Sequence, residues 1–301
     1  MNKVCEEYTK KEMIKVSIIT PAHNEEETIL ACLLSVQNLA VPSNLSVEHL
    51  VVADRCSDRT MKICMERNVR VVEKNWKGNA IDPVTEVVEL GVNESEGEIM
   101  GKVDADIILP KNWLVETLKH FDDDTVSVAS RVKTRSGKWW LDFFMALRDL
   151  NYRVTPLGEE PRGAARLIDR VLLERIGGFD YNWASWDTGL DARVRAAGYR
   201  SVLVKDVCAL EYRPSMTVSG LVSKQIEQGA ARRRMGSSLI RTIGHSLFRL
   251  RPFVLWGYVM KNEENTRDWR SGSPRLAPSQ EADCQGVQRG NCRQLQPRLN
   301  G

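Results

Sequence analysis

Short apolar runs recur along the first hundred residues of this 301-residue chain. Each is rich in β-branched residues, and the first, KVSIIT, is followed directly by Pro21, where we expect it to end. Runs of this length and composition are typical of strands buried in a sheet. The predicted strands lie at residues 15–20, 47–53, 69–73 and 98–103.

Amphipathic segments separate these runs and predict helices. In the first of them, Ile29, Leu33 and Val36 recur at helical spacing on one face. Asn24 and Glu27 precede this face with the spacing of a capping box, which predicts the start of the helix. Further helices are expected over about residues 58–67 and from about residue 83. Strands that alternate with helices predict an α/β fold, a mostly parallel sheet flanked by helices.

An Asp-x-Asp pair follows the fourth predicted strand. Residues two apart in an extended segment project from one face, so Asp104 and Asp106 should point together while Ala105 faces the core. Two carboxylates directed one way suit Mg²⁺ or Mn²⁺, which take oxygen ligands and can bridge the phosphates of a diphosphate. A lone Asp-x-Asp is more often a solvated turn, so its surroundings must decide.

Polar residues follow the other predicted strands as well. Because the carboxyl ends of parallel strands meet at one edge of a sheet, we expect them near the Asp-x-Asp pair. An aspartate there can accept a hydrogen bond from a base, and a lysine can pair with phosphate. Taken singly, each residue also suits a turn, a cap or the surface. They are Pro21, His23, Asn24 and Glu25 after the first strand, Asp54 after the second, and Lys77 after the third.

Beyond residue 125 the pattern is less regular. An aromatic helix is predicted from residue 138 to about 152, and its aromatic side chains suit either core packing or an acceptor platform. A later amphipathic helix ends at Gly198 and carries Asp187 and Asp191 near its start. Both carboxylates could simply stabilise the helix through its dipole.

Positive charge is concentrated in one segment. Between Lys224 and Arg251 there are seven cationic residues and one anion, Glu227, although the net charge of the chain is only +3. Together with nearby apolar residues, this segment predicts a basic amphipathic surface over 224–256 that could bind an anionic membrane. A solvated helix face is the alternative. The segment does not resemble a nucleic-acid-binding module, so no nucleic-acid partner is expected.

Cysteine usage and the ends of the chain bear on its compartment. The seven cysteines are scattered and include no Cys-x-x-Cys pair, which argues for a reducing compartment. The charged lead at residues 1–14 is unlike a signal peptide, and no apolar run of about twenty residues occurs. We therefore expect a cytoplasmic protein, peripheral at most to the inner face of a membrane. Residues 262–301 are poor in apolar side chains and are expected to form a disordered tail.

Taken in order, the motifs resemble those of a known family. Family 2 glycosyltransferases, which have the GT-A fold, carry a nucleotide-binding half similar to VSIITPAHNEEETI, VVADRCSDRT, KGNA and KVDADI. Their acceptor-side segment is similar to RGAARLIDRVLLERIGGFD and WDTGLDARVRAAGYRSVLV. The resemblance covers about residues 16–236, and the ordered combination is far more specific than any single motif. It implies a donor-binding half at 15–110, an acceptor half at 111–215 and basic helices at 216–261.

The resemblance implies a nucleotide pocket. By position, Pro21, His23 and Glu25 would line it, Asp54 would contact the base, and Lys77 would approach the phosphates. The family more usually has an aromatic residue where this chain has His23.

The resemblance also implies a metal ligand and a catalytic base. Asp106 would be the chief ligand of Mg²⁺ or Mn²⁺, with Asp104 meeting the ribose or a metal-bound water. Inverting transfer needs a general base for the acceptor hydroxyl, and Asp187 falls at the family's position for it. Asp191 is the runner-up, and Asp180 a further candidate.

A C-terminal segment completes the resemblance. Residues 225–234 are similar to an element that closes over the donor, where Arg232 could pair with the diphosphate. The resulting hypothesis is a metal-dependent inverting glycosyltransferase that moves a sugar from a nucleotide-sugar donor to a glycan or lipid-linked hydroxyl. A nucleotidyltransferase of sugar phosphates and a catalytically silent nucleotide-sugar-binding module are the alternatives.

Overall fold

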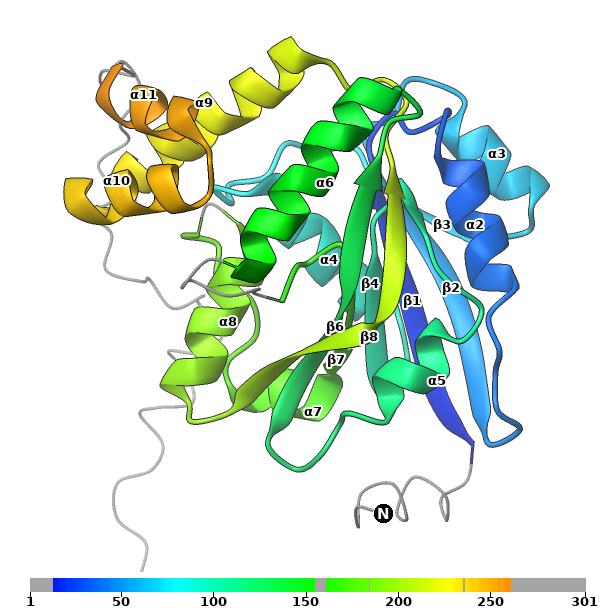
Figure 1. Ribbon diagram of the computed structural model, residues 1–301. Coiled ribbons are helices and arrows are strands. Elements are labelled where there is room, and N and C mark those ends of the chain that lie inside the picture. The colour runs from blue at the N-terminus through cyan, green and yellow to red at the C-terminus, as the bar shows by residue number, and fades with distance from the viewer. Residues whose placement is uncertain (1–12, 155–160, 184, 235, 261–301) are drawn as a thin grey trace, which may run out of the picture. The chain divides into compact units, whose positions relative to one another are not determined.

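The computed structural model describes residues 13–154, 161–183, 185–234 and 236–260. Within these ranges the strands form one eight-stranded sheet in the order β3-β2-β1-β4-β7-β6-β8-β5 (Figure 1). The strands are β1 (Ile14–Ala22), β2 (Leu45–Asp54), β3 (Arg70–Lys74), β4 (Ile99–Val103), β5 (Ile107–Ile108), β6 (Thr125–Arg135), β7 (Ala165–Asp169) and β8 (Arg200–Tyr212). The helices are α2 (Ile29–Gln37), α3 (Thr60–Glu66), α4 (Pro83–Asn93), α5 (Trp113–Leu118), α6 (Trp139–Val154), α7 (Arg170–Arg175), α8 (Trp186–Ala196), α9 (Val218–Arg234), α10 (Leu239–Phe248) and α11 (Pro252–Met260).

The sheet combines parallel and antiparallel strands. Strands β3, β2, β1 and β4 are all parallel, which confirms the arrangement predicted for the first hundred residues. Strand β7 then runs antiparallel to both β4 and β6, while β8 is parallel to β6. The predicted α/β fold is therefore confirmed. The parallel half places the carboxyl ends of β1, β2 and β4 at one edge.

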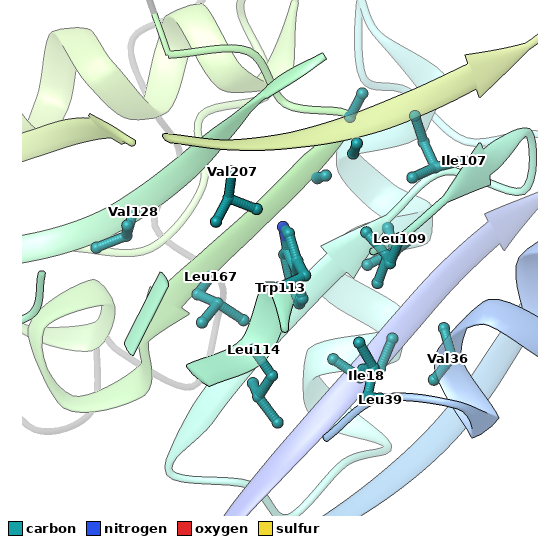
Figure 2. Close-up of a cluster of buried hydrophobic side chains, with 14 of the residues drawn as sticks. Ile18, Val36, Leu39, Ile107, Leu109, Trp113, Leu114, Val128, Leu167 and Val207 are labelled. Atoms are coloured by element: carbon teal, nitrogen blue, oxygen red, sulfur yellow. The ribbon is translucent and has the colours of Figure 1, made fainter. Parts of the chain in front are cut away.

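Consecutive residues of β1 show how the sheet is covered on both faces. Ile18 packs into a core cluster with residues of α2 and α5, whereas Ile19 packs into another with residues of α4, α7 and α8. Side chains alternate between the faces of a strand, so these clusters lie on opposite sides of the sheet. Figure 2 shows the first cluster, with Trp113 of α5 among side chains from several strands. The fully buried Trp113 donates from Nε1 to Ser130 Oγ at 2.9 Å, so its one polar atom is satisfied.

The loop after β1 differs from the prediction. Asn24 does not cap α2: Thr28 occupies the N-cap without a side-chain bond, and Asn24 has a φ of 55°. Its Oδ1 instead accepts from the Ser57 N–H at 2.8 Å and joins the loops after β1 and β2. Asparagine tolerates this left-handed conformation, so the residue type that suggested a cap serves a turn.

Pro21 does not end β1, as had been expected. The strand continues to Ala22, with Pro21 opposite Val52 of β2. The pairing of β1 with β4 stops at Ile19, so the strand has lost one neighbour before it reaches the proline. A proline is tolerated where a strand has an edge.

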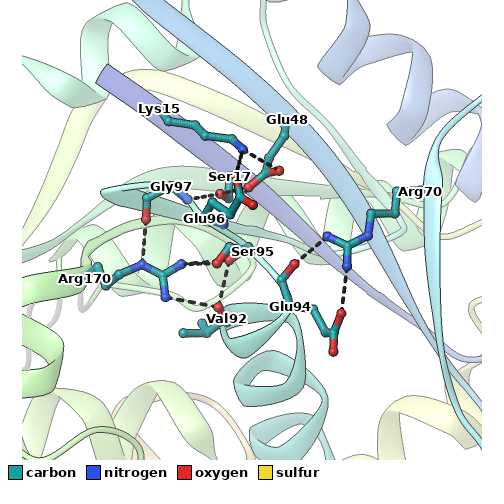
Figure 3. Close-up of polar contacts among 10 residues, drawn as sticks. All are labelled: Lys15, Ser17, Glu48, Arg70, Val92, Glu94, Ser95, Glu96, Gly97 and Arg170. Atoms are coloured by element: carbon teal, nitrogen blue, oxygen red, sulfur yellow. Dashed lines mark hydrogen bonds and ion pairs between the residues drawn. The ribbon is translucent and has the colours of Figure 1, made fainter. Parts of the chain in front are cut away.

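At the opposite, amino-terminal edge, an arginine joins two elements far apart in the sequence (Figure 3). Arg170, the first residue of α7, donates from Nε to the Gly97 carbonyl at 2.7 Å. Its other nitrogens donate to the carbonyls of Val92 at 3.1 Å and Ser95 at 3.0 Å. These bonds satisfy carbonyls at the end of α4 and hold the start of β4 against α7.

A buried ion pair fixes α8 to the sheet. Arg166 of β7 is fully buried and pairs with Asp191 of α8, with Nη1 at 3.3 Å from Oδ2. The same guanidinium donates to Ser127 Oγ of β6 at 2.6 Å and to Ser201 Oγ of β8 at 2.9 Å. One side chain thus connects a helix to three strands.

The expected helical extension at 216–261 is present as α9, α10 and α11. Helices α9 and α11 cross closely, because a Cβ on Gly229 would lie 2.0 Å from the Val254 carbonyl and one on Gly257 2.0 Å from the Ile226 carbonyl. None of the helices in the described part of the chain is long and apolar enough to span a bilayer. The predicted tail at 262–301 and all but residues 13 and 14 of the predicted lead lie outside the described residues.

The ion pair yields a stability prediction. Asp191→Ala leaves a buried guanidinium uncompensated, and we expect it to lower the free energy of unfolding by about 3–5 kcal/mol. The double variant Arg166→Met/Asp191→Leu removes both charges and should recover most of that loss. Urea unfolding measures both, with the exposed Asp123→Ala as control. A loss below about 1 kcal/mol for Asp191→Ala, the size of a surface substitution, would contradict the assigned role.

Candidate active site

The carboxyl ends of β1, β2 and β4 open into a cleft of about 570 Å³. Its wall also includes the start of α8 and the end of β8. Most of the residues singled out in the sequence meet here, as their positions after parallel strands predicted. They are Pro21, His23, Glu25, Asp54, Asp104, Asp106 and Asp187.

Asp106 is the most buried carboxylate of the Asp-x-Asp pair, with 7% of its surface exposed. Its Oδ2 accepts from Arg213 Nε at 2.6 Å, whereas its buried Oδ1 has no hydrogen-bond partner in the described part of the chain. Burial raises the pKa of Asp106 to about 7, even though Arg213 acts in the opposite direction. Oδ1 is thus a buried acceptor without a hydrogen bond, on a carboxylate that resists ionisation. A bound cation would stabilise the ionised form of Asp106 and would satisfy this oxygen.

Asp104 lies on a turn, not on the extended segment that had been expected. The Ile107 N–H donates to the Asp104 carbonyl at 3.0 Å, and the Asp104 N–H donates to the Ala164 carbonyl at 2.9 Å. The Asp104 carboxylate accepts from Lys102 Nζ. Asp104 and Asp106 still line the same cleft while Ala105 is buried, so the predicted facing of the three side chains holds.

These two carboxylates fit a divalent cation in part. Across the described ranges, no group of three or more His, Cys, Asp or Glu residues is arranged to hold a metal. Mg²⁺ and Mn²⁺ are commonly held by one or two carboxylates, with substrate phosphates and water completing the shell. The unpartnered Oδ1 of Asp106 and the neighbouring carboxylate of Asp104 match that pattern.

Asp54 lies at the end of β2 and is 6% exposed. Its carboxylate accepts from Arg55 at 2.9 and 2.8 Å and lies 3.7 Å from Lys74 Nζ. Burial opposes ionisation, but these cations hold the pKa of Asp54 below its usual range. His23 is positioned beside it, with Nδ1 at 2.5 Å from the Asp54 carbonyl oxygen. The end of β2 is thus a charged, ordered part of the cleft wall.

The structure does not bring Lys77 into the cleft. Lys77 is exposed, and the buried lysine of this segment is Lys74, which also lies 3.3 Å from Glu86. Positive charge next to the Asp-x-Asp pair comes instead from Lys102 and Arg213. Lys102 could have been noticed in the sequence, because it is a charged residue within the otherwise apolar strand β4. Arg213 could not, because it lies more than a hundred residues away.

Asp187 begins α8 and lines the cleft. Its Oδ2 accepts from the Gly163 N–H at 2.8 Å, and its Oδ1 accepts from the Thr188 N–H at 2.8 Å and from Ser185 Oγ. Although burial would raise it, the hydrogen bond from Ser185 and the charge of Arg166 hold the pKa of Asp187 below its usual range. Asp187 is therefore ionised at neutral pH and fixed in orientation.

Trp186 fills the base of the cleft next to Asp187. The backbone N–H of Trp186 donates to Asp82 Oδ2 at 2.8 Å, and Lys102 Nζ lies 5.1 Å from the centroid of the indole ring. A Cβ at Gly163 would lie 2.6 Å from this ring, so the close approach requires glycine. Asp82 also caps α4, and so ties the starts of two helices together.

The remaining candidates lie elsewhere. Asp191 is held by Arg166, and Asp180 lies 3.3 Å from Arg193 Nη2, so both runner-up bases are in ion pairs and outside the cleft lining. Arg232 of α9 is not among the cleft residues either.

Comparison with known proteins finds a family match and several relatives. The family model described as "Glycosyl transferase family 2" matches residues 17–157. The "Probable glycosyltransferase YdaM" of Bacillus subtilis is 30% identical over 207 residues, which are 63% of this chain and 48% of that protein. The chain spans about half the length of the curated relatives that it matches.

Two solved structures share the fold. A mannosyltransferase from Pyrobaculum calidifontis, PcManGT in complex with GDP-Man and Mn²⁺, superposes with a TM-score of 0.57 at 19% identity, covering 86% of this chain and 76% of that one. TarS 1–349 of S. aureus in complex with UDP-GlcNAc has a TM-score of 0.51 at 17% identity, with 80% and 75% covered. The likeness establishes the GT-A fold. Over residues 17–157, just under half of the chain, the sequence matches glycosyltransferase family 2, and the fold agrees with that match.

Proposed function

We propose that this protein transfers a sugar, with inversion, from a nucleoside-diphosphate donor to an acceptor hydroxyl in a metal-dependent reaction. The observation that carries the proposal is the pairing of two unlike carboxylate environments in one cleft. Asp106 has a raised pKa and an unpartnered oxygen, while Asp187 has a lowered pKa and lies among hydrogen-bond donors. The first suits a cation ligand and the second a proton acceptor.

Asp106 and Asp104 would hold Mg²⁺ or Mn²⁺ through Oδ1 of Asp106 and the Asp104 carboxylate. When bound, the cation supplies charge neutralisation for the leaving diphosphate. Lys102 and Arg213 keep positive charge next to both carboxylates, where a diphosphate would lie. The related fold of PcManGT, which was crystallised with Mn²⁺, supports the choice of metal.

The nucleotide would lie along the ends of β1 and β2. Pro21, His23, Glu25 and Asp54 line this part of the cleft. Arg55 donates two hydrogen bonds to the Asp54 carboxylate and lines the cleft as well. UDP- and GDP-sugars are the donors to test first, because the two structures with the same fold were solved with one of each.

Asp187 would act as the general base. It takes the proton of the acceptor hydroxyl, whose oxygen forms a bond to the anomeric carbon of the sugar. The bond from that carbon to the diphosphate oxygen breaks, and the electron pair leaves with the diphosphate. The Gly163, Thr188 and Ser185 donors keep Asp187 ionised and aimed for this step.

The acceptor would be a glycan or lipid-linked hydroxyl, approached from an anionic membrane surface. Helices α10 and α11 expose large apolar side chains, with Ile240 82%, Leu247 70% and Trp256 57% exposed. Arg233, Arg234 and Arg241 lie in the same segment, 224–256, and would meet acidic headgroups.

Substitution of the proposed metal ligand provides the first test. Asp106→Asn should reduce Mn²⁺-dependent release of nucleoside diphosphate from a panel of UDP- and GDP-sugars by at least about a hundredfold, because charge on the leaving group is no longer neutralised. The exposed Asp123→Asn should match wild type. A folded Asp106→Asn enzyme with the wild-type rate would contradict the proposal. Release of pyrophosphate from a nucleoside triphosphate by the wild-type enzyme would also contradict it.

A second substitution separates base catalysis from binding. Asp187→Asn should lower kcat by about 10²–10⁴-fold. The Kd for the donor, measured by calorimetry, should stay unchanged, since Asp187 acts on the acceptor. The matched variant Asp180→Asn, whose carboxylate pairs with Arg193, should keep its turnover. Equal losses in the two variants, or none in Asp187→Asn, would show that Asp187 is not the base.

Membrane association is tested with vesicles. Ile240→Ser and Trp256→Ser should each weaken cosedimentation with phosphatidylglycerol vesicles by about tenfold, because each removes a large apolar side chain from the bilayer surface. Met65→Ser removes a similarly exposed side chain from α3 and should have no effect. Wild type and all variants should bind phosphatidylcholine vesicles more weakly than phosphatidylglycerol vesicles. Equal binding of all variants would exclude this surface.

A further inference from the structure

A second cavity, of about 820 Å³, adjoins the candidate active site. Its lining comes from α6, the end of β8, α9 and the turn from α10 to α11. Figure 1 shows how these elements are arranged. Arg162, Glu211 and Arg213 line both this cavity and the cleft, so the two spaces meet at these residues.

The cavity is strongly cationic. Glu211 is the one carboxylate among the described residues of its lining, and it is already occupied by Thr134 Oγ1 at 2.5 Å and Arg213 Nη2 at 2.8 Å. Two further carboxylates pair with the lining from outside it: Asp149 lies 3.0 Å from Arg148, and Asp106 lies 2.6 Å from Arg213. The cationic residues of the lining are Arg148, Arg162, Arg213, Lys224, Arg249 and Arg251.

Lys224 is the clearest sign of uncompensated charge. In the part of the chain that the structure describes, no carboxylate forms an ion pair with it. The Lys224 side chain is partly exposed, and its partial burial together with the charge of Arg213 lowers its pKa. Arg251 donates to the neutral amide oxygen of Gln228 at 2.9 Å, and the buried Gln225 Oε1 nearby has no partner among the described residues. A bound anion would compensate Lys224, and a hydroxyl could donate to Gln225.

The remaining wall of the cavity is apolar. Met145 of α6 packs against Met216, which precedes α9, and Leu221 of α9, and all three line the cavity. Phe144 and Leu147 of α6 also line the cavity, although each is largely exposed elsewhere on its surface. A ligand with an anionic group and an apolar portion would therefore match both walls.

We propose that this cavity binds the phosphate group of a phosphorylated acceptor, whose hydroxyl extends into the adjoining cleft towards Asp187. Arginine and lysine together are the side chains best suited to a phosphate ester. The proposal rests on the proposed function, since it gives the acceptor its chemical class. The phosphate could belong to a soluble phosphate ester or to a lipid.

The donor diphosphate does not account for these cations. It is expected at Asp104 and Asp106 in the cleft, and Lys224 and Arg251 line only the cavity. An anion at Lys224 and a diphosphate at the Asp-x-Asp pair would occupy separate spaces joined at Arg213. Donor and acceptor could then be bound together, as direct transfer requires.

Two probes distinguish the sources of phosphate. Calorimetry without metal or donor compares sn-glycerol 3-phosphate with dihexanoyl phosphatidic acid below its micellar concentration. We expect binding that Lys224→Gln and Arg251→Gln each weaken about tenfold, as loss of a charged hydrogen bond does. Lys62→Gln on α3 makes the same change of charge far from the cavity and should bind as wild type. Tighter binding of the lipid indicates a lipid source, and equal binding indicates a soluble one.

Further outcomes would overturn the proposal. They are the failure of both probes to bind, equal binding by all variants, and displacement of either probe by UDP or GDP, which would place it in the donor site. Lys224 is an exposed helix residue, so the Lys224→Gln protein should fold even if Arg251→Gln does not. Because no donor or turnover is involved, a failure here is distinguishable from the failure of Asp106→Asn or Asp187→Asn to impair release of the diphosphate.

Discussion

The buried ion pair between Arg166 and Asp191 is the constraint on which the geometry of the cleft depends. A guanidinium with no exposed surface must be neutralised and fully hydrogen-bonded, and here α8 supplies the carboxylate. Asp187 lies one turn before Asp191 on that helix, so the pair that occupies one aspartate also positions the other. Strand β7 carries Arg166, and the residue that precedes the strand, Ala164, accepts from the Asp104 N–H through its carbonyl. One strand therefore sets both walls of the cleft.

Within the cleft, similar carboxylates acquire different properties from their surroundings. Asp106 is surrounded by protein and by other carboxylates, and only Arg213 compensates it, so its pKa rises. Asp187 is also shielded from water, but backbone N–H groups and Ser185 donate to it, and its pKa falls. Desolvation acts on both, and the number of donors decides the direction. The proposed division of labour between cation ligand and base follows from this difference.

Much of the fold could be predicted because strand and helix periodicities are strong in the first hundred residues. Parallel strands also bring their carboxyl ends together, which predicted where Pro21, Asp54 and Asp104 would lie. The predictions that were wrong concern residues whose contacts are with residues distant in the sequence. Asn24 bonds the loop after β2 and does not cap α2. Lys77 was predicted to approach the phosphates, but the buried lysine of this segment is Lys74, whose carboxylate partners Asp54 and Glu86 cannot be recognised from the sequence.

The charged side chains that later parts of the chain bring to the site could not be predicted from the sequence either. Arg213 reaches Asp106 because β8 pairs with β5, a two-residue strand that no periodicity reveals. The helix pattern alone could not separate Asp191 from Asp187, since both lie near the start of the same helix. The resemblance favoured Asp187, and in the structure Arg166 pairs with Asp191.

The central claim is that a divalent cation at the Asp-x-Asp turn links the protein to the donor diphosphate. Thermal unfolding of the wild-type protein with UDP- and GDP-sugars, each with Mn²⁺ and with chelator, tests it most directly, because a ligand that binds the native state raises Tm. The account predicts that at least one nucleotide sugar raises Tm with Mn²⁺ and loses most of that effect with chelator. An equal rise under both conditions, or no rise with any donor, would contradict it.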